Sequence, residues 1–596
     1  LVRWLPRLFA VGPGLALGFW LLFTPGSVGA LLDGNGKLWI RATGLIIMVM
    51  TALFLSFTIF RTRFAGRVGR YQIGQGTFGT WAVRAAQVLP VVLFFLVLIS
   101  PIRFPEYVGT LFLTAVFIGL ITFLLSWSSL FSLRTGFPMT LFLFGLAIIW
   151  SIFDTNDNHE VRKVALKGPG SHLQVINAFD AWLLNRPDLD WYQSKGRRYP
   201  VYVIAAESGG IYAAHHASSF LARVQDLCPG FARHIFAISG ISGGSLGASI
   251  FASLLRDPKF SSALPSGSEP VKCYESCGEP GKLETTVDSI FSNDLLSPLV
   301  ASTLLKDVPQ RFWPLPIGSF ARARALEDAV VFAWDREDTT TGLLEVGVSD
   351  AWRADGDVPA LVLNTTNVET GELAAASPFV LTWPGRQVPI IDRYLDDGED
   401  LSVLSAAVLS ARFTYITPAG TLFLHPDFVE NGEPRPKVRF VDGGYFENSG
   451  VDTAMDIIET ARPIALAGGA DIRLNSLDYE TERSDANHFL GETLSPIRAL
   501  LATRKNRGRL AIERAESRMV GFCDLGGDQP SQCDDFFDIN DPVRISKIHD
   551  RQGPLPLGWL LSKRSRAIIG DQIGWPHQCN YITGYAVPDD KGELSD

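Results

Sequence analysis

The sequence has few charged residues, and its first quarter has almost no acidic ones. Only 19% of the 596 residues are charged and 47% are hydrophobic, a composition that excludes an intrinsically disordered protein. Acidic residues outnumber basic ones by 62 to 53, which excludes a protein built mainly to bind nucleic acid. Residues 1–153 contain eleven Lys and Arg but only two acids, Asp33 and Glu106. They carry a net charge of +9 in a chain whose total is −9, so the remainder carries −18.

The same residues lack long polar segments, because five apolar stretches occupy most of them. These stretches lie at residues 4–23, 38–60, 85–102, 108–127 and 137–153. Each is close to the roughly 20 residues that a helix needs to cross a bilayer. Five such segments in a row rarely serve the core of a soluble protein, and a signal peptide would not be followed by further spans. We expect an α-helical transmembrane domain of about five helices at residues 1–153, followed by a polar connector at residues 154–198.

Loop charges predict the orientation of this domain. The loop between the second and third stretches contains no acid and five arginines, Arg61, Arg63, Arg67, Arg70 and Arg84. Cytoplasmic loops collect Lys and Arg, so we place this loop in the cytoplasm. Three crossings then put the large domain on the periplasmic side of a bacterial-type inner membrane. One crossing fewer would reverse that placement.

Cysteine is absent from the transmembrane part, and all six cysteines lie in the large domain. An even number in a domain expected outside the cytoplasm favours disulfides. The spacings suggest two local pairs and one distant pair, Cys273–Cys277, Cys523–Cys533 and Cys228–Cys579. Free buried thiols are a second interpretation. Zinc is a third and is less favoured, because neither short spacing fits a zinc ribbon. No metal and no cofactor is expected.

Apolar strands alternate with helices from residue 199 onward, without repeats or low-complexity tracts. This alternation is typical of a parallel sheet that is covered on both faces. The expected elements lie at residues 199–206, 211–227, 234–239 and 246–255, with further strands at 360–364 and 438–441. We expect an α/β three-layer domain with a mainly parallel central sheet at residues 199–596, with an insertion at about 259–344.

The segment FAISGISGGSLGAS contains Gly-x-Ser-x-Gly twice, centred on Ser242 and on Ser245. Such a match often arises by chance, so its structural context decides its meaning. The expected strand ends at Ser239 and the expected helix begins near Gly244. Ser242 therefore falls in a sharp strand-to-helix turn that exposes its hydroxyl, whereas Ser245 falls inside the helix. We assign the nucleophile to Ser242.

A serine nucleophile needs a base to take its proton and donors to stabilise the oxyanion. The base candidate is Asp442, which follows an apolar strand in VRFVDGGYFENSG. Active residues gather at the carboxyl ends of the strands in a parallel sheet, so Asp442 can meet Ser242 there. The oxyanion donors are expected to be the backbone N–H groups of Ser208, Gly209, Gly210 and Gly243.

The order of these motifs resembles that of the patatin-like phospholipases and the related cytosolic phospholipases over about residues 199–450. The resemblance implies a patatin-like fold in which a Ser–Asp dyad hydrolyses acyl esters without a histidine. Residues 207–212 are similar to the oxyanion loop of the family, residues 240–245 to its nucleophile elbow and residues 441–444 to its aspartate motif.

The oxyanion loop departs from the family pattern. Glu207 and Ser208 replace its first two positions, and Tyr212 replaces its arginine. The loop therefore lacks a positive charge that would neutralise a phosphate or an oxyanion. Arg412, in the segment SARFTYITPAG, is the candidate to supply that charge as a substrate-binding residue.

Together these features predict a membrane-anchored serine lipid acyl hydrolase, a carboxylic ester hydrolase of the phospholipase A or lysophospholipase type. Its expected partners are membrane lipids and proteins that could dock on the transmembrane domain, with no nucleic acid. One alternative is a catalytically weak or inactive patatin-like subunit that acts as a lipid-binding or assembly scaffold. Another is an acyltransferase that uses the same serine.

Two further features have plainer interpretations. A Ser-His-Asp triad would need His488, His549 or His577, and it is less favoured because the aspartate already stands in Asp-Gly-Gly. A helix expected at residues 494–520 is dense in Arg and Lys. It could face anionic headgroups, but a solvated helix face is the favoured interpretation.

Overall fold

The structure of the chain is a computed structural model. It describes residues 5–23, 38, 41–53, 55–56, 59, 88, 92–167, 173–263, 268, 273, 279–383, 386–387, 390–413, 416–429, 433–480, 491–524, 543–549, 555 and 558–574. The chain divides into two compact units, residues 1–100 with 550–555 and residues 101–549 with 556–596.

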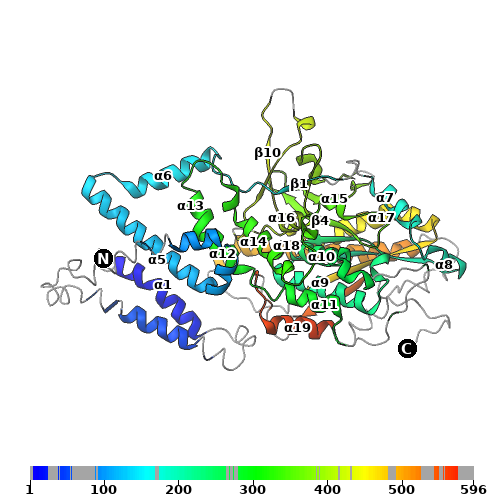
Figure 1. Ribbon diagram of the computed structural model, residues 1–596, viewed down its shortest axis with the longest axis horizontal. Helices are drawn as coiled ribbons and strands as arrows, with labels where there is room; N and C mark the ends of the chain where they lie inside the picture. The colour runs from blue at the N-terminus through cyan, green and yellow to red at the C-terminus, as the bar shows by residue number, and fades with distance from the viewer. Residues whose placement is uncertain are drawn as a thin grey trace. The chain divides into compact units, whose positions relative to one another are not determined.

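Two helices of the first unit, α1 (Leu5–Leu22) and the helix Arg41–Leu53, approach each other closely at small residues (Figure 1, dark blue). A Cβ added to Gly44 would lie 2.9 Å from the carbonyl oxygen of Gly18, closer than side chains normally come to a backbone atom. Glycines at such crossings let helix backbones touch, which is common between helices in membranes.

Two further apolar helices, α5 (Arg103–Thr135) and α6 (Met139–Ile152), belong to the second unit. Gly109, with a φ of 77°, interrupts the helical geometry near the start of α5. Among the described residues, α5 is the one helix long and apolar enough to cross a membrane, while α6 and Arg41–Leu53 are apolar but shorter. The described helices do not show a five-span domain, which stays a prediction.

An eight-stranded sheet organises the second unit. Its order is β12 (Arg544–His549), β11 (Ala470–Glu480), β2 (Tyr199–Ala206), β3 (Ile235–Ile241), β4 (Ala360–Asn367), β10 (Lys437–Asp442) and β9 (Gly420–Phe423), with β5 (Leu373–Ala376) also paired to β4. The strands from β12 to β4 are parallel, and β10, β9 and β5 are antiparallel to their neighbours. The prediction of an α/β domain around a mainly parallel sheet is confirmed.

β10 is antiparallel to β4, whereas we expected a parallel strand. The carboxyl end of β10 nevertheless lies at the same edge of the sheet as that of β3, because β4 pairs with both strands. The first half of β4 pairs with β3, as far as Asn364 opposite Ile241. Its second half pairs with β10 in the antiparallel sense, with Thr365 opposite Asp442. The last residues of β3 and β10 therefore lie beside consecutive residues of β4, although the two strands run in opposite directions.

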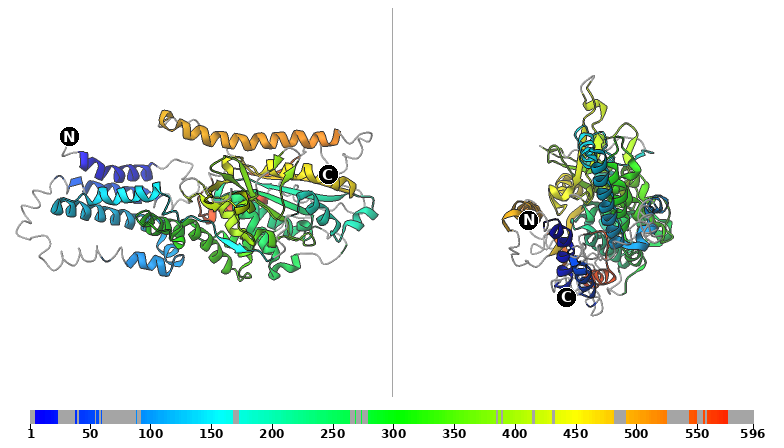
Figure 2. Two further views of the ribbon diagram at one scale, coloured as in Figure 1. Left: turned by 90° about the horizontal axis from the view of Figure 1, so that it is seen from above. Right: turned by 90° about the vertical axis from the view of Figure 1, so that its left-hand side faces the viewer.

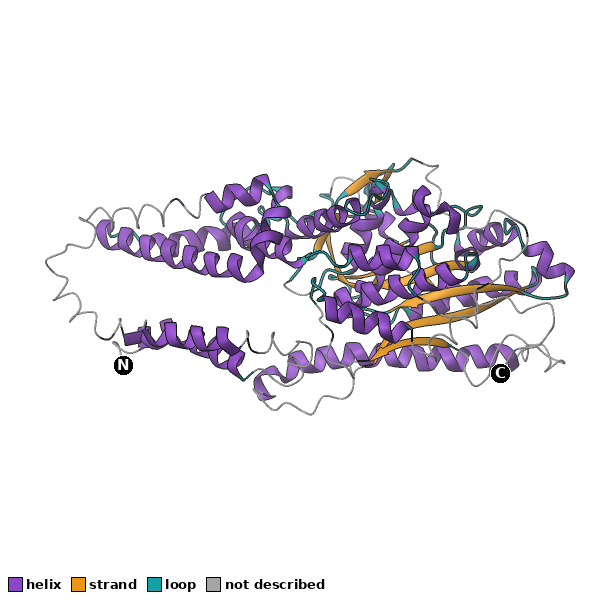
Figure 3. Cartoon of the chain, turned by 60° about the horizontal axis from the view of Figure 1, so that its bottom comes forward, coloured by secondary structure: helices purple, strands orange, loops and turns teal. Residues whose placement is uncertain are grey.

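Helices lie on both faces of the sheet (Figure 3). On one face, α9 (Gly210–Leu227) and α10 (Gly243–Arg256) pack against each other and the strands. On the other face, α7 (Val175–Leu184) and α17 (Val451–Ala467) share a core with alternate residues of β2, Val201, Val203 and Ala205. The Phe236 ring of β3 stacks on Phe379 in this core at 5.4 Å between centroids.

The segment between α10 and β4, here called the insertion, is largely helical. It contains α11 (Lys282–Ile290), α12 (Leu296–Ser302) and α14 (Arg322–Asp335). Polar contacts attach the start of α5 to it: Thr110 Oγ1 lies 2.8 Å from Ser297 Oγ, and Glu106 pairs with Arg336 at 3.6 Å. The apolar helix α5 is thus fixed to the insertion at one end.

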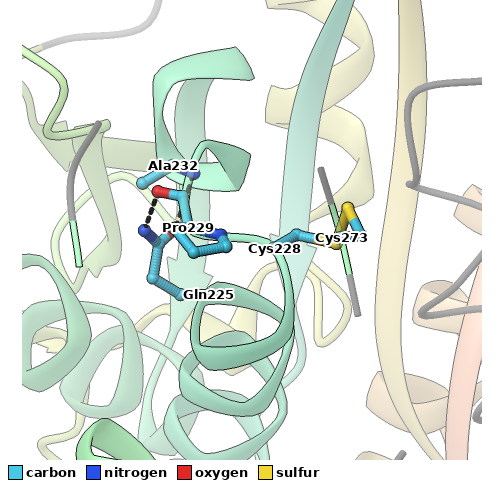
Figure 4. The surroundings of a disulfide bond; sticks show 5 residues. All are labelled: Gln225, Cys228, Pro229, Ala232 and Cys273. Atoms are coloured by element: carbon cyan, nitrogen blue, oxygen red, sulfur yellow. Dashed lines mark hydrogen bonds between the residues drawn. A yellow bond between two sulfur atoms is a disulfide. The ribbon is translucent and has the colours of Figure 1, made fainter. Parts of the chain in front are cut away.

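The disulfide pattern differs from the predicted one. Cys228, just after α9, is bonded to Cys273 in the insertion (Figure 4). The predicted pairs Cys273–Cys277 and Cys228–Cys579 are therefore wrong. Cys277, Cys533, Cys579 and the side chain of Cys523 lie outside the described residues.

Contacts beside the disulfide explain why sequence spacing failed to predict it. The insertion folds back on α9, where the Asp226 carboxylate accepts the N–H groups of Leu283 and Glu284 at 3.1 and 3.0 Å. Gln225 fixes the turn that carries Cys228, because its side chain donates to the carbonyl of Pro229 and accepts the N–H of the nearby Ala232 (Figure 4). The pairing of Cys228 thus depends on tertiary folding.

Candidate active site

Ser242 lies in a strained turn between β3 and α10, where the sequence predicts it. Its φ of 53° and ψ of −119° form a backbone conformation that residues other than glycine rarely adopt. Ser410, the last residue of α16 (Val403–Ser410), holds the turn: its Oγ accepts the Ser242 N–H at 3.0 Å and donates to the carbonyl of Asn364. This geometry is typical of the elbow that presents a serine nucleophile.

The two glycines after Ser242 are required by a close approach of two backbones. A Cβ on Gly243 would collide with the carbonyl oxygen of Gly210, and a Cβ on Gly244 would collide with that of Ala206. The segment that follows β2 therefore lies directly against the start of α10. Larger residues at these positions would push the turn at Ser242 and the proposed oxyanion loop apart.

Asp442 is buried next to Ser242. Its Oδ1 accepts the N–H of Gly444 at 2.7 Å, and its Oδ2 has no regular hydrogen-bond partner among the described residues. Burial raises the pKa of this carboxyl, while the positive charge of Arg504, the neighbouring Ser242 hydroxyl and the Gly444 N–H oppose the rise. The structure therefore brings the side chains of the predicted serine and aspartate close to each other.

The predicted oxyanion donors differ in their availability. The Ser208 N–H donates to the carbonyl of Asn448 at 2.9 Å, so it is not available to an oxyanion in this conformation. The N–H groups of Gly209, Gly210 and Gly243 have no acceptor within the described part of the chain, and the last two begin α9 and α10. The starts of two helices thus supply donors near Ser242, together with their positive dipole ends.

Arg504 is the charged residue of the site that sequence reasoning missed. It comes from α18 (Gly491–Asp524), the long orange helix in the left view of Figure 2. Its Nη2 donates to Ser208 Oγ at 2.7 Å and to Asn448 Oδ1 at 2.8 Å, and its Nε donates to the same amide oxygen at 3.0 Å. The guanidinium also lies over the Phe413 ring, 5.0 Å from its centroid.

One local signal could have pointed to this face of α18. Gly508 stands one turn after Arg504 in the interior of a long helix, where glycine is disfavoured. A Cβ there would lie 3.3 Å from the Cβ of Asn448, so the glycine marks a close approach of the helix to the loop after β10. Nothing in the sequence shows which arginine of this basic helix points into the site.

Arg412, the predicted substrate-binding residue, is held elsewhere by its side chain. Its Nη1 donates to the carbonyls of His159 and Pro418 at 3.3 and 3.4 Å, and the residue is 2% exposed. Burial lowers the pKa of this guanidinium to about 10, with opposition from Glu327. Only its backbone carbonyl touches the site, by accepting the Asp442 N–H at 3.0 Å.

Glu207, which replaces the first position of the family loop, is tied to β11. One carboxyl oxygen accepts from Asn448 Nδ2 at 2.6 Å and the other from the Tyr479 N–H at 2.9 Å. Burial raises the pKa of this carboxyl well above its usual range, and the neighbouring Asp478 raises it further. The hydrogen bonds from Tyr479 and Asn448 oppose the rise, and they anchor the proposed oxyanion loop.

Of the three histidines considered for the alternative triad, the structure describes His549, which is not at Ser242. His549 lies in β12, at the edge of the sheet and separated from β3 by β11 and β2. His488 and His577 lie outside the described residues.

Comparisons with known proteins add one distant similarity. No protein-family model matches the sequence, and no curated protein matches it. Among solved structures, the chain is similar to human GIVD cytosolic phospholipase A2 at 15% identity and a TM-score of 0.28, over 58% of this chain and 58% of that chain. A TM-score this low does not establish a shared fold, so the assignment of function depends on the geometry of the site.

Proposed function

We propose that this protein is a serine lipid acyl hydrolase that uses Ser242 as nucleophile and Asp442 as its base. One observation carries the proposal: a serine in a strained strand-to-helix turn lies beside a buried carboxylate, one oxygen of which has no regular hydrogen-bond partner among the described residues. The Ser242 hydroxyl is the neighbouring donor that lowers the pKa of this carboxyl, so it is the group from which Asp442 could take a proton.

The reaction proceeds in two halves. Ser242 Oγ attacks the ester carbonyl while Asp442 Oδ2 takes the hydroxyl proton, and the oxyanion faces the N–H groups of Gly209, Gly210 and Gly243. The intermediate collapses, and the lipid alcohol leaves with the proton from Asp442. Water then attacks the acyl-enzyme, giving its proton to Asp442, and Ser242 recovers a proton as the fatty acid leaves. The raised pKa of Asp442 makes it a stronger base than a solvated carboxylate.

Arg504 takes the role that the sequence suggested for Arg412. Its charge opposes the rise in the Asp442 pKa and so favours the ionised form of the base. Its contact with Ser208 also holds the loop that carries the oxyanion donors. A positive charge at this position favours a lipid with an anionic headgroup, a phospholipid or lysophospholipid.

The membrane attachment belongs to the same proposal. Residues 1–153 would form the transmembrane domain of about five helices, with the sheet domain on the periplasmic side. The apolar surface of α5 and the small-residue contact of Gly18 with Gly44 support attachment to a bilayer. The Cys228–Cys273 disulfide supports an oxidising compartment for the large domain.

A fluorophosphonate probe tests the chemistry directly. The probe should label wild type and fail to label Ser242→Ala, whereas Ser249→Ala should still be labelled, because Ser249 lies farther along α10. Asp442→Asn should slow ester hydrolysis by about 10²- to 10⁴-fold, as the loss of a general base does. Product analysis with lipid alcohols present separates hydrolysis from acyl transfer.

A scaffold without catalysis is the second candidate, favoured by the Ser208 N–H that donates to Asn448 instead of remaining free. In that case folded wild-type protein would not react with the probe and would co-purify with a partner protein. Labelling at Ser242 would exclude this alternative.

A further inference from the structure

A short apolar loop of the insertion, residues 311–317, is exposed and yet held in a fixed shape. Its large apolar side chains are exposed to 37% at Phe312, 54% at Trp313 and 63% at Leu315. Beneath them the buried Gln310 donates to the carbonyl of Leu315 at 2.7 Å and accepts the N–H of Ile317 at 3.1 Å. The loop presents these side chains to its surroundings instead of burying them.

The backbone N–H groups of this loop are largely paired within the protein. The N–H groups of residues 311, 312 and 313 donate to the carbonyls of residues 308, 309 and 310 at 3.2, 3.0 and 3.0 Å. Pro314 and Pro316 have no N–H group. In this loop, only the Leu315 N–H has no acceptor among the described residues. The carbonyls of residues 311, 315 and 317 accept hydrogen bonds, whereas those of residues 312–314 and 316 have no donor within the described part of the chain. Paired N–H groups with some free carbonyls suit the hydrated headgroup boundary of a bilayer better than its hydrocarbon core.

The loop continues the apolar surface of α6. The Phe312 ring contacts the ring of Phe144 in α6, with 6.0 Å between centroids. No residue of α6 is buried, and its large apolar side chains are exposed over several turns. α6 packs on α5 but leaves its large apolar side chains exposed, and this exposed surface joins that of the loop, which indicates a single covering medium for both.

We propose that residues 311–317 form an interfacial anchor that enters the headgroup boundary of the bilayer contacted by α5 and α6. Trp313 is the central residue, since an indole combines an apolar body with an N–H donor and suits this boundary. On the protein side, Arg311 pairs with Asp307 at 2.7 Å and keeps the polar end of the loop fixed. The inference rests on the proposed membrane attachment of α5 and α6 and not on the hydrolase chemistry.

Depth-dependent fluorescence quenching tests the anchor. The full chain is reconstituted in phosphatidylcholine vesicles that carry bromine at shallow, middle or deep acyl positions. The emission of Trp313 is obtained as the difference between wild type and Trp313→Phe. Trp352→Phe provides the matched control, because Trp352 packs on Phe379 in the core of the sheet domain, 5.8 Å between ring centroids.

We expect shallow bromines to reduce the Trp313 emission at least twofold and more than deep bromines do, with no effect on the Trp352 emission. Equal quenching of Trp313 by aqueous iodide in vesicles and in detergent, without bromine quenching, would overturn the anchor. Protection from both quenchers would also overturn it, because a protein surface would then cover the loop. Protein that fails to float with vesicles would refute the membrane attachment itself, while probe labelling of Ser242 would still report the chemistry separately.

Discussion

Replacing Arg504 by glutamine should make the proposed reaction more sensitive to acid. Arg504 opposes the rise in the Asp442 pKa, so its loss should raise that pKa further. Asp442 can act as a base only when it is ionised. The acid limb of the pH–rate profile should therefore move to higher pH, with the largest loss of rate below the limb and only a smaller loss, from the missing contact with Ser208, well above it.

The structure bounds the size of this effect. A Cβ on Gly444 would lie 2.9 Å from both Arg504 Nε and Asp442 Oδ1, so these two atoms are no more than 5.8 Å apart. At an effective dielectric constant near 20, unit charges at that distance interact by about 3 kcal/mol. Solvent at the partly exposed guanidinium should reduce this to roughly half. A loss of about 1.4 kcal/mol corresponds to a rate about tenfold lower below the limb.

The assay is kcat/KM for a soluble, uncharged short-chain ester across the pH range, which removes any contribution from a substrate phosphate. Arg507→Gln is the matched control, since Arg507 is on the same helix but its guanidinium lies over Phe446, 4.6 Å from the ring centroid. Arg504→Lys should restore part of the acid tolerance, because it keeps the charge. A rate lowered by the same factor at every pH would show that Arg504 has only a structural role and would refute this reasoning.

Three further predictions follow from the packing. Gly243→Ala should lower activity at least tenfold and stability by about 1–3 kcal/mol, because its Cβ meets the Gly210 carbonyl; Gly570→Ala, which meets nothing within 4 Å, is the control in activity and melting assays. Removing the disulfide by Cys228→Ala should lower the free energy of denaturant unfolding by about 4 kcal/mol at most, as the closed loop of 45 residues implies. The pair Trp313→Ser and Leu315→Ser should slow hydrolysis of esters in vesicles and leave a soluble ester unaffected; equal slowing of both would contradict interfacial binding.

Features that depend on a local run of the chain could be predicted from the sequence. The turn at Ser242 is one, because an apolar strand, glycines and a helical pattern follow one another within about twenty residues. The place of Asp442 at a strand end is another. The direction of β10 was not predictable in this way, since it depends on β4 being long enough to pair with β3 along one half and with β10 along the other.

Features that depend on tertiary contacts could not be predicted. The sequence does not indicate that the Ser208 N–H has an acceptor, because the Asn448 carbonyl reaches it only in the folded chain. Arg504 is one of several basic residues on α18, and the docking of that helix alone selects it. Arg412 follows a suggestive motif, but the neighbouring carbonyls of His159 and Pro418 bind its guanidinium.

Asn448 explains why the proposed base and the proposed oxyanion loop should act as one unit. Its carbonyl accepts the Ser208 N–H, its amide nitrogen donates to Glu207, and its amide oxygen accepts from Arg504. The loop that follows Asp442 is therefore bonded to the loop that follows β2 and to α18. Arg504 donates twice, so these are four hydrogen bonds. Each contributes only about 1 kcal/mol, but all four share one side chain and its peptide group. A shift of α18 would move Arg504 and, through Asn448, both the carboxylate that takes the proton and the backbone that receives the oxyanion.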